Sequence, residues 1–397
     1  MTDECQLFLS KRLVTETKIF DGGVLVDERG VIVDVLERNE AEKLITQSKG
    51  KLKVTDGGDW ALIAGVVDSH VHVNEPGRTA WEGFRTATNA AAAGGITTIV
   101  DMPLNSIPPT TTLENLKTKV KSATGHVYVD VGFWGGVIVG NQDSLRDLVK
   151  AGVVGFKCFL CPSGVDEFPN VGAEDLELAF NALEGTGSVL AFHAELEDDC
   201  PDDKTTNKQD PEEYNTYLES RPPKMELNAI SLITSFLERT EYEMLWKCLL
   251  DDKLDLVVSD HSPCTPDLKC SNNLEAWGGI SSVQFGLSLF WTQASTRGLD
   301  LRAISKYLSN GPANLCGLQN RKGALKKGLD ADLVYFAPDE TFVIKSDIIR
   351  HKNKLTPYIG KELKGVVKKT YVRGQLVFAE GDIVGEPKGK LLIGGLD

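Results

Sequence analysis

Side chains that can bind metal ions follow several apolar segments of the chain. His70-Val71-His72 ends an apolar run that begins at Leu62. Residues two apart on a strand point to the same face, so both imidazoles can reach one ion. A pair of surface or hydrogen-bonded histidines is the plain alternative. By itself the H-x-H pair leaves both interpretations open.

Three further apolar segments end in a group that can bind a cation. They are residues 154–156 before Lys157, residues 189–192 before His193, and residues 256–259 before Asp260. Taken singly, such a lysine usually extends to solvent and such an aspartate often caps a helix. A dry pocket, however, favours the neutral lysine amine, which can react with carbon dioxide to form a carbamate that bridges two cations. Four such segment ends together favour a metal centre.

The middle of the chain supplies the elements that must position these groups. Apolar strands are predicted at 62–67, 95–100, 129–134, 153–156, 189–192 and 254–258, with helices at 81–93, 113–123, 142–151 and 173–183. Near-continuous apolar strands that alternate with helices indicate a parallel sheet covered by helices. The candidate ligands fall at the carboxyl ends of the strands, where α/β barrels place their chemistry.

Both ends of the chain have a different pattern. The first sixty residues contain short strands separated by turn residues, and residues 332–336 and 370–378 repeat this texture. The second of these reads as a hairpin that turns at Arg373-Gly374. We therefore predict one small β-sandwich built from both termini. The predicted division is 1–62 and 327–397 for the sandwich and tail, and 63–326 for the barrel.

Composition narrows the class of protein. The 397 residues carry 43 Lys and Arg against 57 Asp and Glu, a net charge of −14, and contain no basic block. Such a chain is poorly suited to nucleic acid or anionic membranes. No segment reads as a transmembrane span or signal peptide, and the last three residues match no peroxisomal address. Eight cysteines in this length do not make a disulfide framework. We expect a cytoplasmic enzyme.

Longer motifs make the sequence similar to a known family. The motifs are His70-Val71-His72, residues 156–159, residues 192–195 and residues 258–264, with residues 74–84 and 101–110. The first four resemble the cyclic amidohydrolases, and the last two resemble the allantoinases among them. The resemblance implies a TIM-type (β/α)₈ barrel with a flanking β-sandwich, and a homo-oligomer, which is a tetramer in the family.

The same resemblance implies an activity and its cofactors. Two zinc ions per subunit would be bridged by a carboxylated Lys157, and the small-molecule substrate would be allantoin, whose hydantoin ring amide is hydrolysed to give allantoate. Asp260 would be both a metal ligand and the catalytic proton shuttle. The implied metal ligands are His70, His72, Lys157, His193 and Asp260.

Two departures from the related dihydroorotases bear on the substrate. Those enzymes carry an arginine that clamps a substrate carboxylate where this chain has Asn74, and a histidine where it has Cys264. Because allantoin has no carboxylate, loss of the clamp suits it. Asn105, Cys264, Gly278 and Gly279 are therefore candidate substrate contacts. An ordinary turn explains the two glycines equally well.

The spacing of the ligand positions also predicts a shortened barrel. A barrel of eight units repeats about every 31 residues, but His193 and Asp260 are 67 residues apart with no predicted strand between them. Residues 225–250 read instead as one long helix. We therefore predict about six of eight strands, with two βα units missing between 240 and 241. The second zinc site would be impaired, because it keeps only Lys157 and His193.

Two other functions stay open at this point. One is a ring hydrolase of the dihydropyrimidinase or hydantoinase type. The other is a non-catalytic assembly partner that keeps the amidohydrolase surface. The four ligand-bearing strand ends favour enzymatic ancestry, because a scaffold has no reason to keep them.

Overall fold

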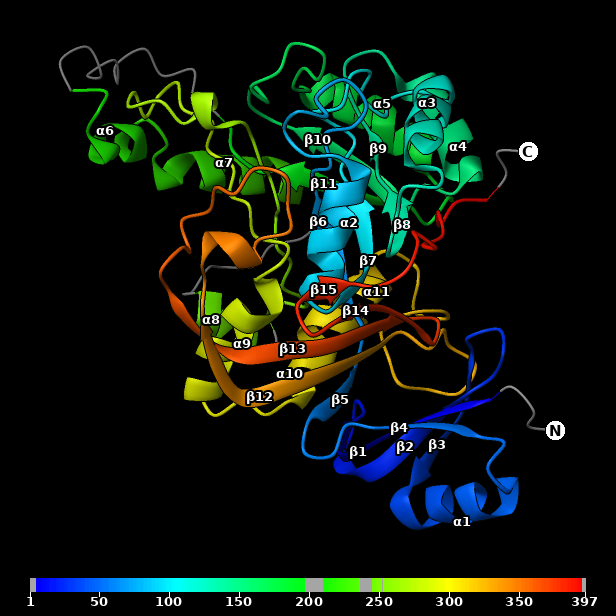
Figure 1. Ribbon diagram of the computed structural model, residues 1–397. Coiled ribbons are helices and arrows are strands. Elements are labelled where there is room, and N and C mark those ends of the chain that lie inside the picture. The colour runs from blue at the N-terminus through cyan, green and yellow to red at the C-terminus, as the bar shows by residue number, and fades with distance from the viewer. Residues whose placement is uncertain (1–4, 197–209, 236–244, 252, 395–397) are drawn as a thin grey trace.

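Strands from both ends of the chain pair in one sheet, which lies below the α/β part in Figure 1. The computed structural model describes residues 5–196, 210–235, 245–251 and 253–394. The strands of this sheet are β1 (Gln6–Val14), β2 (Ile19–Val26), β3 (Ile32–Glu37), β4 (Lys53–Asp56), β5 (Ala61–Ala64), β12 (Leu333–Val343), β13 (Glu362–Val372), β14 (Gln375–Ala379) and β15 (Asp382–Ile383). Their order is β15-β14-β13-β12-β5-β1-β2-β3, with β4 beside β1.

The join between the two ends is made by β5. It pairs antiparallel with β12 and parallel with β1, so an early strand lies between late and early neighbours. The β13–β14 hairpin turns at Arg373 and Gly374, which have φ values of +48° and +71°. Helix α1 (Arg38–Ser48), which the sequence analysis did not anticipate, begins with a capping box in which Glu40 accepts a hydrogen bond from the Glu37 amide at 3.0 Å.

The α/β part contains parallel strands that alternate with helices. They are β6 (Val66–Val71), α2 (Phe84–Ala93), β7 (Ile96–Asp101), α3 (Leu113–Ala123), β8 (Asp130–Phe133), β9 (Gly135–Gly136), α4 (Gln142–Ala151), β10 (Gly155–Phe159), α5 (Ala173–Leu183) and β11 (Val189–His193). The strands form two neighbouring ladders, β6-β7-β8 and β9-β10-β11, in which β8 and β9 are separated by Trp134 alone. The fold is therefore a TIM-barrel-like α/β fold with a β-sandwich part.

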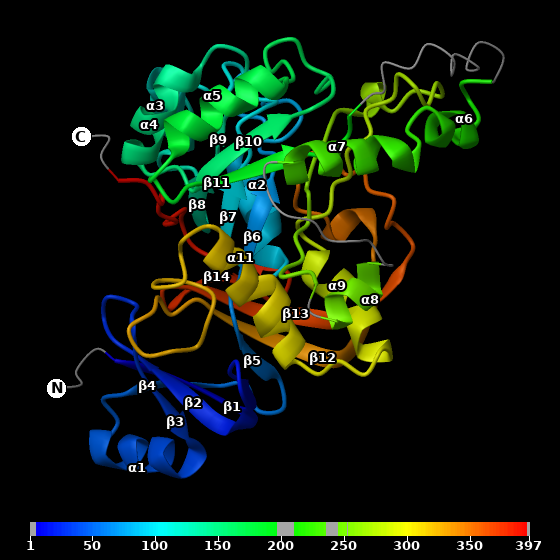
Figure 2. The ribbon, with the colours of Figure 1, turned by 180° about the vertical axis from the view of Figure 1, so that it is seen from behind.

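Helices and short helical turns follow β11, and they form much of the right side of Figure 2. They are α6 (Tyr214–Glu219), α7 (Pro223–Ser235), α8 (Leu245–Leu250), the 3₁₀ turn η3 (Pro266–Leu268), α9 (Gly286–Thr296), α10 (Arg302–Ile304), the π-helix η4 (Ser305–Asn310), α11 (Gly311–Leu315) and the 3₁₀ turn η5 (Ser346–Ile348). The predicted helix over 225–250 corresponds to α7 and α8, and its predicted junction at Arg239-Thr240-Glu241 lies outside the described residues. Within the described ranges, no helix is long and apolar enough to cross a membrane.

The predicted strand over 254–258 is wrong as a regular strand. The backbone there forms no ladder among the described residues, and the first parallel bridge joins His261 to Val71. The Val257 amide donates instead to the Tyr307 carbonyl at 2.9 Å. The segment has too few paired backbone groups to count as a strand.

Buried ion pairs connect the α/β part to the sheet of the termini. Asp130, at the start of β8, lies 2.6 Å from the Lys322 ammonium and is bound by the Arg373 guanidinium. Its carboxylate also accepts a hydrogen bond from the Lys390 amide at 2.7 Å, while Lys322 contacts Asp332 at 2.7 Å. Because these ionic side chains are almost completely excluded from water, removal of one leaves its partners with one counter-charge fewer in a water-free site.

Candidate metal centre

Two imidazoles and one carboxylate converge beside the carboxyl end of β6. Asp260 Oδ1 lies 3.3 Å from His70 Nε2 and 3.6 Å from His72 Nε2. The ligand atoms of these three residues all lie within 4.8 Å of one another. The His72 amide donates to the His261 carbonyl at 2.8 Å, which holds the Asp260 segment beside β6. Three of the five predicted metal ligands are therefore brought together.

The end of β7 supports the same site from the other side. Asp101 accepts a hydrogen bond from the Val73 amide at 2.9 Å, directly after the H-x-H pair. Its second oxygen forms a buried ion pair with Lys119 of α3 at 2.7 Å. The loop that leaves His72 is thus fixed by a charge that itself has a partner.

Burial sets the protonation of the converging groups. It lowers the pKa of His70 to about 3, with a further contribution from the neighbouring His72 and Lys157 and against the effect of Asp260. Burial alone would raise the pKa of Asp260, but the hydrogen bond from His72 and the nearby positive charges bring that pKa below its usual range. At neutral pH the site therefore holds a neutral His70 imidazole and an ionised Asp260 carboxylate.

Lys157 lies on β10 in a nearly water-free position. It is 6% exposed, and its ammonium lies 5.5 Å from the centre of the Phe159 ring. Burial lowers the pKa of its amine, although Cys158 and Asp260 act in the opposite direction. The predicted dry environment of this lysine is what the structure has.

His193 belongs to a second group of ligand atoms. Its Nε2 lies 2.9 Å from Glu195 Oε2, and the Sγ of Cys161 lies 3.8 Å from the same oxygen. The Arg221 guanidinium also binds Glu195. The His193 ring stacks on Phe159 with 4.6 Å between the ring centres and 9° between the planes. The structure thus places His193 with Cys161 and Glu195.

The predicted substrate contacts fall in different surroundings. The Asn105 amide nitrogen lies 3.2 Å from His72 Nδ1, and Cys264 is buried at 2% exposure. A side chain at Gly279 would place its Cβ 2.2 Å from the Ser262 carbonyl oxygen. Packing against Ser262 therefore explains why residue 279 is a glycine. A Cβ at Gly278 would have 3.8 Å to its nearest neighbour.

His261, next to Asp260, is turned away from the converging ligands. Its Nε2 lies 3.3 Å from Glu82 Oε2, and its Nδ1 accepts hydrogen bonds from the Ser282 and Val283 amides at 3.0 and 3.3 Å. The ring therefore carries its proton on Nε2 and donates it to Glu82. The His261 side chain therefore points away from the group of His70, His72 and Asp260.

His351 makes the stability of the fold depend on pH. Burial and the adjacent His261 lower the pKa of His351 to about 4, while Glu82 acts against them. Between pH 6.5 and 4 the unfolded chain binds a proton that the folded chain does not. Stability therefore decreases as the pH is lowered through this window. The loss is roughly 3 kcal/mol, because a shift of one pKa unit corresponds to about 1.36 kcal/mol. We expect His351→Asn, which can still donate to the Asn353 carbonyl, to flatten this slope in urea unfolding.

An exposed histidine provides the control for this measurement. His126→Asn changes a side chain that is already in water, so its unfolding free energy should keep the wild-type dependence on pH. An unchanged slope in His351→Asn would contradict the assignment.

Comparison with known proteins adds a family to this geometry. The model of the "Amidohydrolase family" matches residues 61–377, which is most of the chain and contains both groups of ligand atoms. The chain belongs to the amidohydrolase family.

Curated amidohydrolase relatives cover most of the chain. An allantoinase of Streptomyces avermitilis is 41% identical over 86% of this chain and 89% of its own, and the mitochondrial allantoinase of Aquarana catesbeiana is 44% identical over 80% and 77%. The allantoinase of Arabidopsis thaliana is 35% identical over 96% and 90%. That alignment has 459 positions, 62 more than the 397 residues here, so at least 62 positions have no counterpart in this chain.

Solved amidohydrolase structures share the fold. An L-hydantoinase from Arthrobacter aurescens has a TM-score of 0.86 and 25% identity over 99% of this chain and all of its own. A dihydropyrimidinase from Brevibacillus agri has a TM-score of 0.81 at 21% identity over 98% of both chains. The TIM-barrel-like architecture with a β-sandwich is therefore that of its family.

Cys161 and Glu195 were not among the predicted ligands. Each lies two residues beyond the end of its strand, and His72 lies one residue beyond the end of β6. Cys158 and Cys161 form a C-x-x-C pair, and Glu195 follows His193 at the H-x-E spacing. These two spacings are the signals that could have identified them.

Proposed function

We propose that this amidohydrolase hydrolyses allantoin, opening an amide bond of its hydantoin ring to give allantoate. Sequence relatives named allantoinase cover most of the chain. The single observation that carries the chemistry is the convergence of His70, His72 and Asp260 beside β6. No feature of the chain favours the assembly-partner alternative over this enzyme.

The distances between these groups fit a bound zinc ion. Zinc bonds of about 2.0–2.2 Å to nitrogen and oxygen in a tetrahedral arrangement place the ligand atoms about 3.4 Å apart. The observed separations from Asp260 to the two imidazoles are 3.3 and 3.6 Å. Little movement of these three side chains would be needed to hold an ion.

Asn105 would orient His72 for that ion. Its Oδ1 is buried without a hydrogen-bond partner among the described residues, while its Nδ2 faces His72 Nδ1. Rotation of the amide would bring Oδ1 to accept from the Nδ1–H of His72. The Nε2 lone pair would then be free for the ion, as in metal sites whose histidines donate their other ring proton. The direct substrate contact predicted for Asn105 stays a prediction.

Lys157 would supply the bridging ligand. Its burial favours the neutral amine, which is the form that adds carbon dioxide. The resulting carbamate is an anionic oxygen donor, suited to the positive charge of the predicted zinc ions.

The residues of the chain would have separate roles in hydrolysis, namely metal binding and proton transfer. Bound zinc would lower the pKa of water and polarise the ring carbonyl. His72 and His70, the latter neutral at working pH, would hold the ion, and the ionised Asp260 would accept the proton of the attacking water and deliver it to the departing ring nitrogen.

Substrate choice would depend on the residues after the H-x-H pair. Asn74 is 1% exposed, and its amide nitrogen lies 3.4 Å from the Pro263 carbonyl oxygen in the loop after Asp260. A neutral amide provides no guanidinium to bind a substrate carboxylate. Initial rates with allantoin, dihydrouracil and dihydroorotate test the substrate: we expect allantoin to exceed the others by roughly tenfold or more. Faster turnover of dihydrouracil would favour the hydantoinase alternative.

We also propose that the barrel is short of two βα units between 240 and 241. The 62 or more unmatched alignment positions support this, and so does burial on the two sides of the proposed gap. Every residue of β10 is buried, whereas every residue of its neighbour β11 is only half-buried. Residues 256–259 are half-buried as well. Two apolar edges with this exposure are expected where strands are missing.

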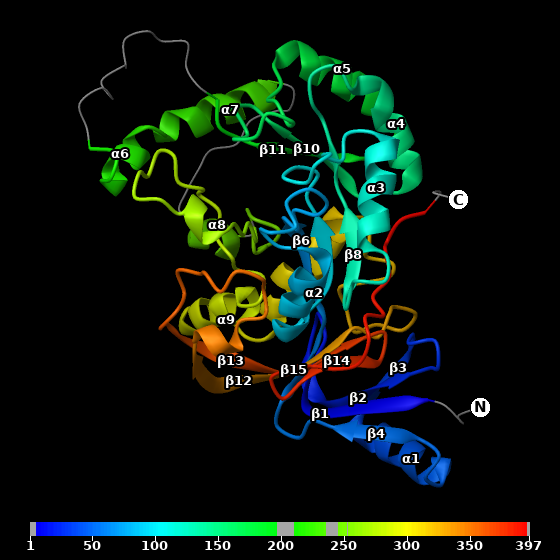
Figure 3. The same ribbon diagram turned by 45° about the horizontal axis from the view of Figure 1, so that its top comes forward.

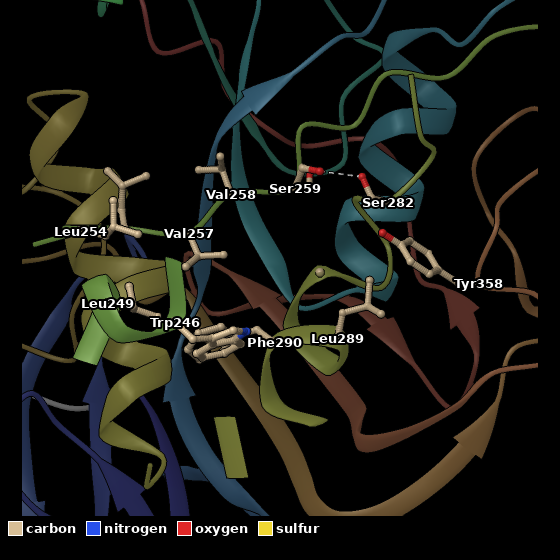
Figure 4. A pocket seen from close by; sticks show the side chains of 12 residues that line it. Trp246, Leu249, Leu254, Val257, Val258, Ser259, Ser282, Leu289, Phe290 and Tyr358 are labelled. Atoms are coloured by element: carbon tan, nitrogen blue, oxygen red, sulfur yellow. Dashed lines mark hydrogen bonds between the residues drawn. The ribbon is translucent and has the colours of Figure 1, made fainter. Parts of the chain in front are cut away.

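An apolar pocket of about 400 Å³ adjoins one of these edges (Figure 4). Val257, Val258 and Ser259 line it on one side, and Trp246 of α8 and Phe290 of α9 line it on another. Figure 3 shows α7 alongside β11 on the far side of the proposed gap, while α8 lies next to α9. Side chains that a complete barrel would cover thus border open volume.

Restoration of the missing segment tests this proposal. The corresponding segment of the Streptomyces avermitilis relative, inserted between residues 240 and 241, should raise allantoin turnover by tenfold or more, since it would complete the barrel around the ligands. A glycine-serine insert of equal length is the matched control and should raise nothing. Full activity of the natural chain, unchanged by the graft, would contradict the deletion.

A homo-oligomer and a cytoplasmic location stay predictions. Light scattering of the purified protein checks the first. Fractionation of the source cells checks the second, for which the mitochondrial relative in Aquarana catesbeiana marks the other outcome.

A further inference from the structure

We infer that Cys161, His193 and Glu195 form a cysteine-containing site for a divalent transition-metal ion. Their ligand atoms, Sγ, a ring nitrogen and a carboxylate oxygen, all lie within 4.8 Å of one another. None of the three belongs to the group of His70, His72 and Asp260. Of these three residues, only His193 was predicted from the sequence to bind a metal, together with Lys157.

The separations match a tetrahedral ion bound through sulfur. With a bond of about 2.3 Å to sulfur and 2.0–2.2 Å to nitrogen and oxygen, neighbouring ligand atoms lie about 3.4–3.6 Å apart. In the structure Glu195 Oε2 lies 3.8 Å from the Cys161 Sγ and 2.9 Å from His193 Nε2. Shifts of about half an ångström would produce the bonded geometry.

The two parallel strands place these groups at one edge. Phe159 and His193 are register partners at the ends of β10 and β11. Cys161 and Glu195 each follow two residues later, so their side chains extend from the same carboxyl edge. The Phe159 ring, stacked flat on His193, fixes the orientation of the imidazole that faces Glu195.

Charge and ligand softness favour a transition ion. A Cys161 thiolate and the Glu195 carboxylate together carry two negative charges, which a divalent cation would balance. In the structure Arg221 supplies positive charge to Glu195. Its side chain is 40% exposed, so it can move into solvent when an ion binds. Thiolate with imidazole selects zinc-like ions over magnesium or calcium.

Three protein ligands leave a fourth tetrahedral position, which the proposed Lys157 carbamate would fill. Cys161 and Glu195 would thus add two donors to the Lys157 and His193 that the second zinc site was predicted to keep. The inference rests on the proposed function only in assigning His193 to an ion. It does not depend on allantoin as the substrate.

Cobalt(II) titration of the chelator-treated full chain tests the site without any substrate. A thiolate ligand gives a near-ultraviolet charge-transfer band, which histidine, carbamate and carboxylate ligands do not give. We expect this band in the wild type to reach its plateau by two equivalents, because the group of His70, His72 and Asp260 also takes up an ion. The band should vanish in Cys161→Ser and require a roughly tenfold higher cobalt concentration in Glu195→Gln.

Cys158→Ser is the matched control. Cys158 is buried on the same strand, but its Sγ faces the Ala191 carbonyl at 3.7 Å rather than the ligand group. This variant should keep the full band. A band that survives in Cys161→Ser, or that is missing from the wild type, would overturn the inference.

X-ray absorption of the zinc-loaded wild type covers the case in which Cys161→Ser does not fold. A sulfur neighbour at about 2.3 Å is expected, and a shell of nitrogen and oxygen alone would overturn the site. Allantoin turnover without a sulfur signal would remove this inference and leave the proposed function intact. A sulfur signal without turnover would do the reverse.

Discussion

Asp260→Asn is expected to lower the kcat for allantoin by about 10²- to 10⁴-fold, the usual contribution of a positioned proton-transfer group. The asparagine amide keeps the size of the side chain but can neither accept the proton of the attacking water nor balance the charge of an ion. Because Asp260 lies 3.3 and 3.6 Å from the two imidazoles, the variant should also hold less zinc after dialysis. Steady-state rates and metal analysis of the same preparations measure both effects.

The matched control is Asp267→Asn, in the same loop region and also exposed to solvent, but outside the group of ligand atoms. It should retain wild-type turnover and zinc content. If Asp260→Asn hydrolysed allantoin within about tenfold of wild type, the assignment of Asp260 as proton acceptor would fail. Lost zinc with a normal fold would instead identify the ligand role as the dominant one.

Asp130→Ala is expected to reduce the free energy of unfolding by about 3–5 kcal/mol, as is typical when one partner of a buried ionic group is removed. Burial by itself would raise the pKa of Asp130, but Lys322 and Arg373 bring it below the usual range, so the carboxylate is ionised. Its loss leaves Lys322 and Arg373 with one counter-charge fewer in a site that excludes water. Urea unfolding at neutral pH measures the change.

Asp59→Ala is the matched control for this prediction. Asp59 pairs with Lys11 at 2.9 Å, but its side chain is 83% exposed. Surface pairs of this kind contribute about 0–1 kcal/mol. Equal effects of the two substitutions would show that burial of the Asp130 network does not determine its contribution.

Local pattern predicted most of the regular elements. Helices α3, α4 and α5 lie at the predicted residues, because their apolar positions recur at helical spacing. The predicted strand over 254–258 failed, because a strand depends on partners distant in sequence and this segment has too few. Helix α1 escaped notice because its capping box is polar and its buried face is small.

The sequence and the tertiary structure likewise determined different features of the candidate site. The sequence by itself determined which groups stand at the strand ends, since the carboxyl ends of parallel strands share one edge whatever their exact packing. His70, His72, Lys157, His193 and Asp260 could all be named on that ground. The family resemblance also assigned His70, His72 and Asp260 to one ion, but it did not assign Cys161 and Glu195 to His193, because that grouping depends on how the two segment ends pack.

The tertiary structure brings Asp260 beside the H-x-H pair, and it alone placed His193 with Cys161 and Glu195. It also turned His261 toward Glu82, although His261 directly follows Asp260 in the chain. Asp260 has a left-handed backbone with a φ of +44°, so the two side chains leave the chain in different directions, and packing fixes the partner that each one meets. The sequence thus determined the chemistry that is available, and packing decided which atoms share it.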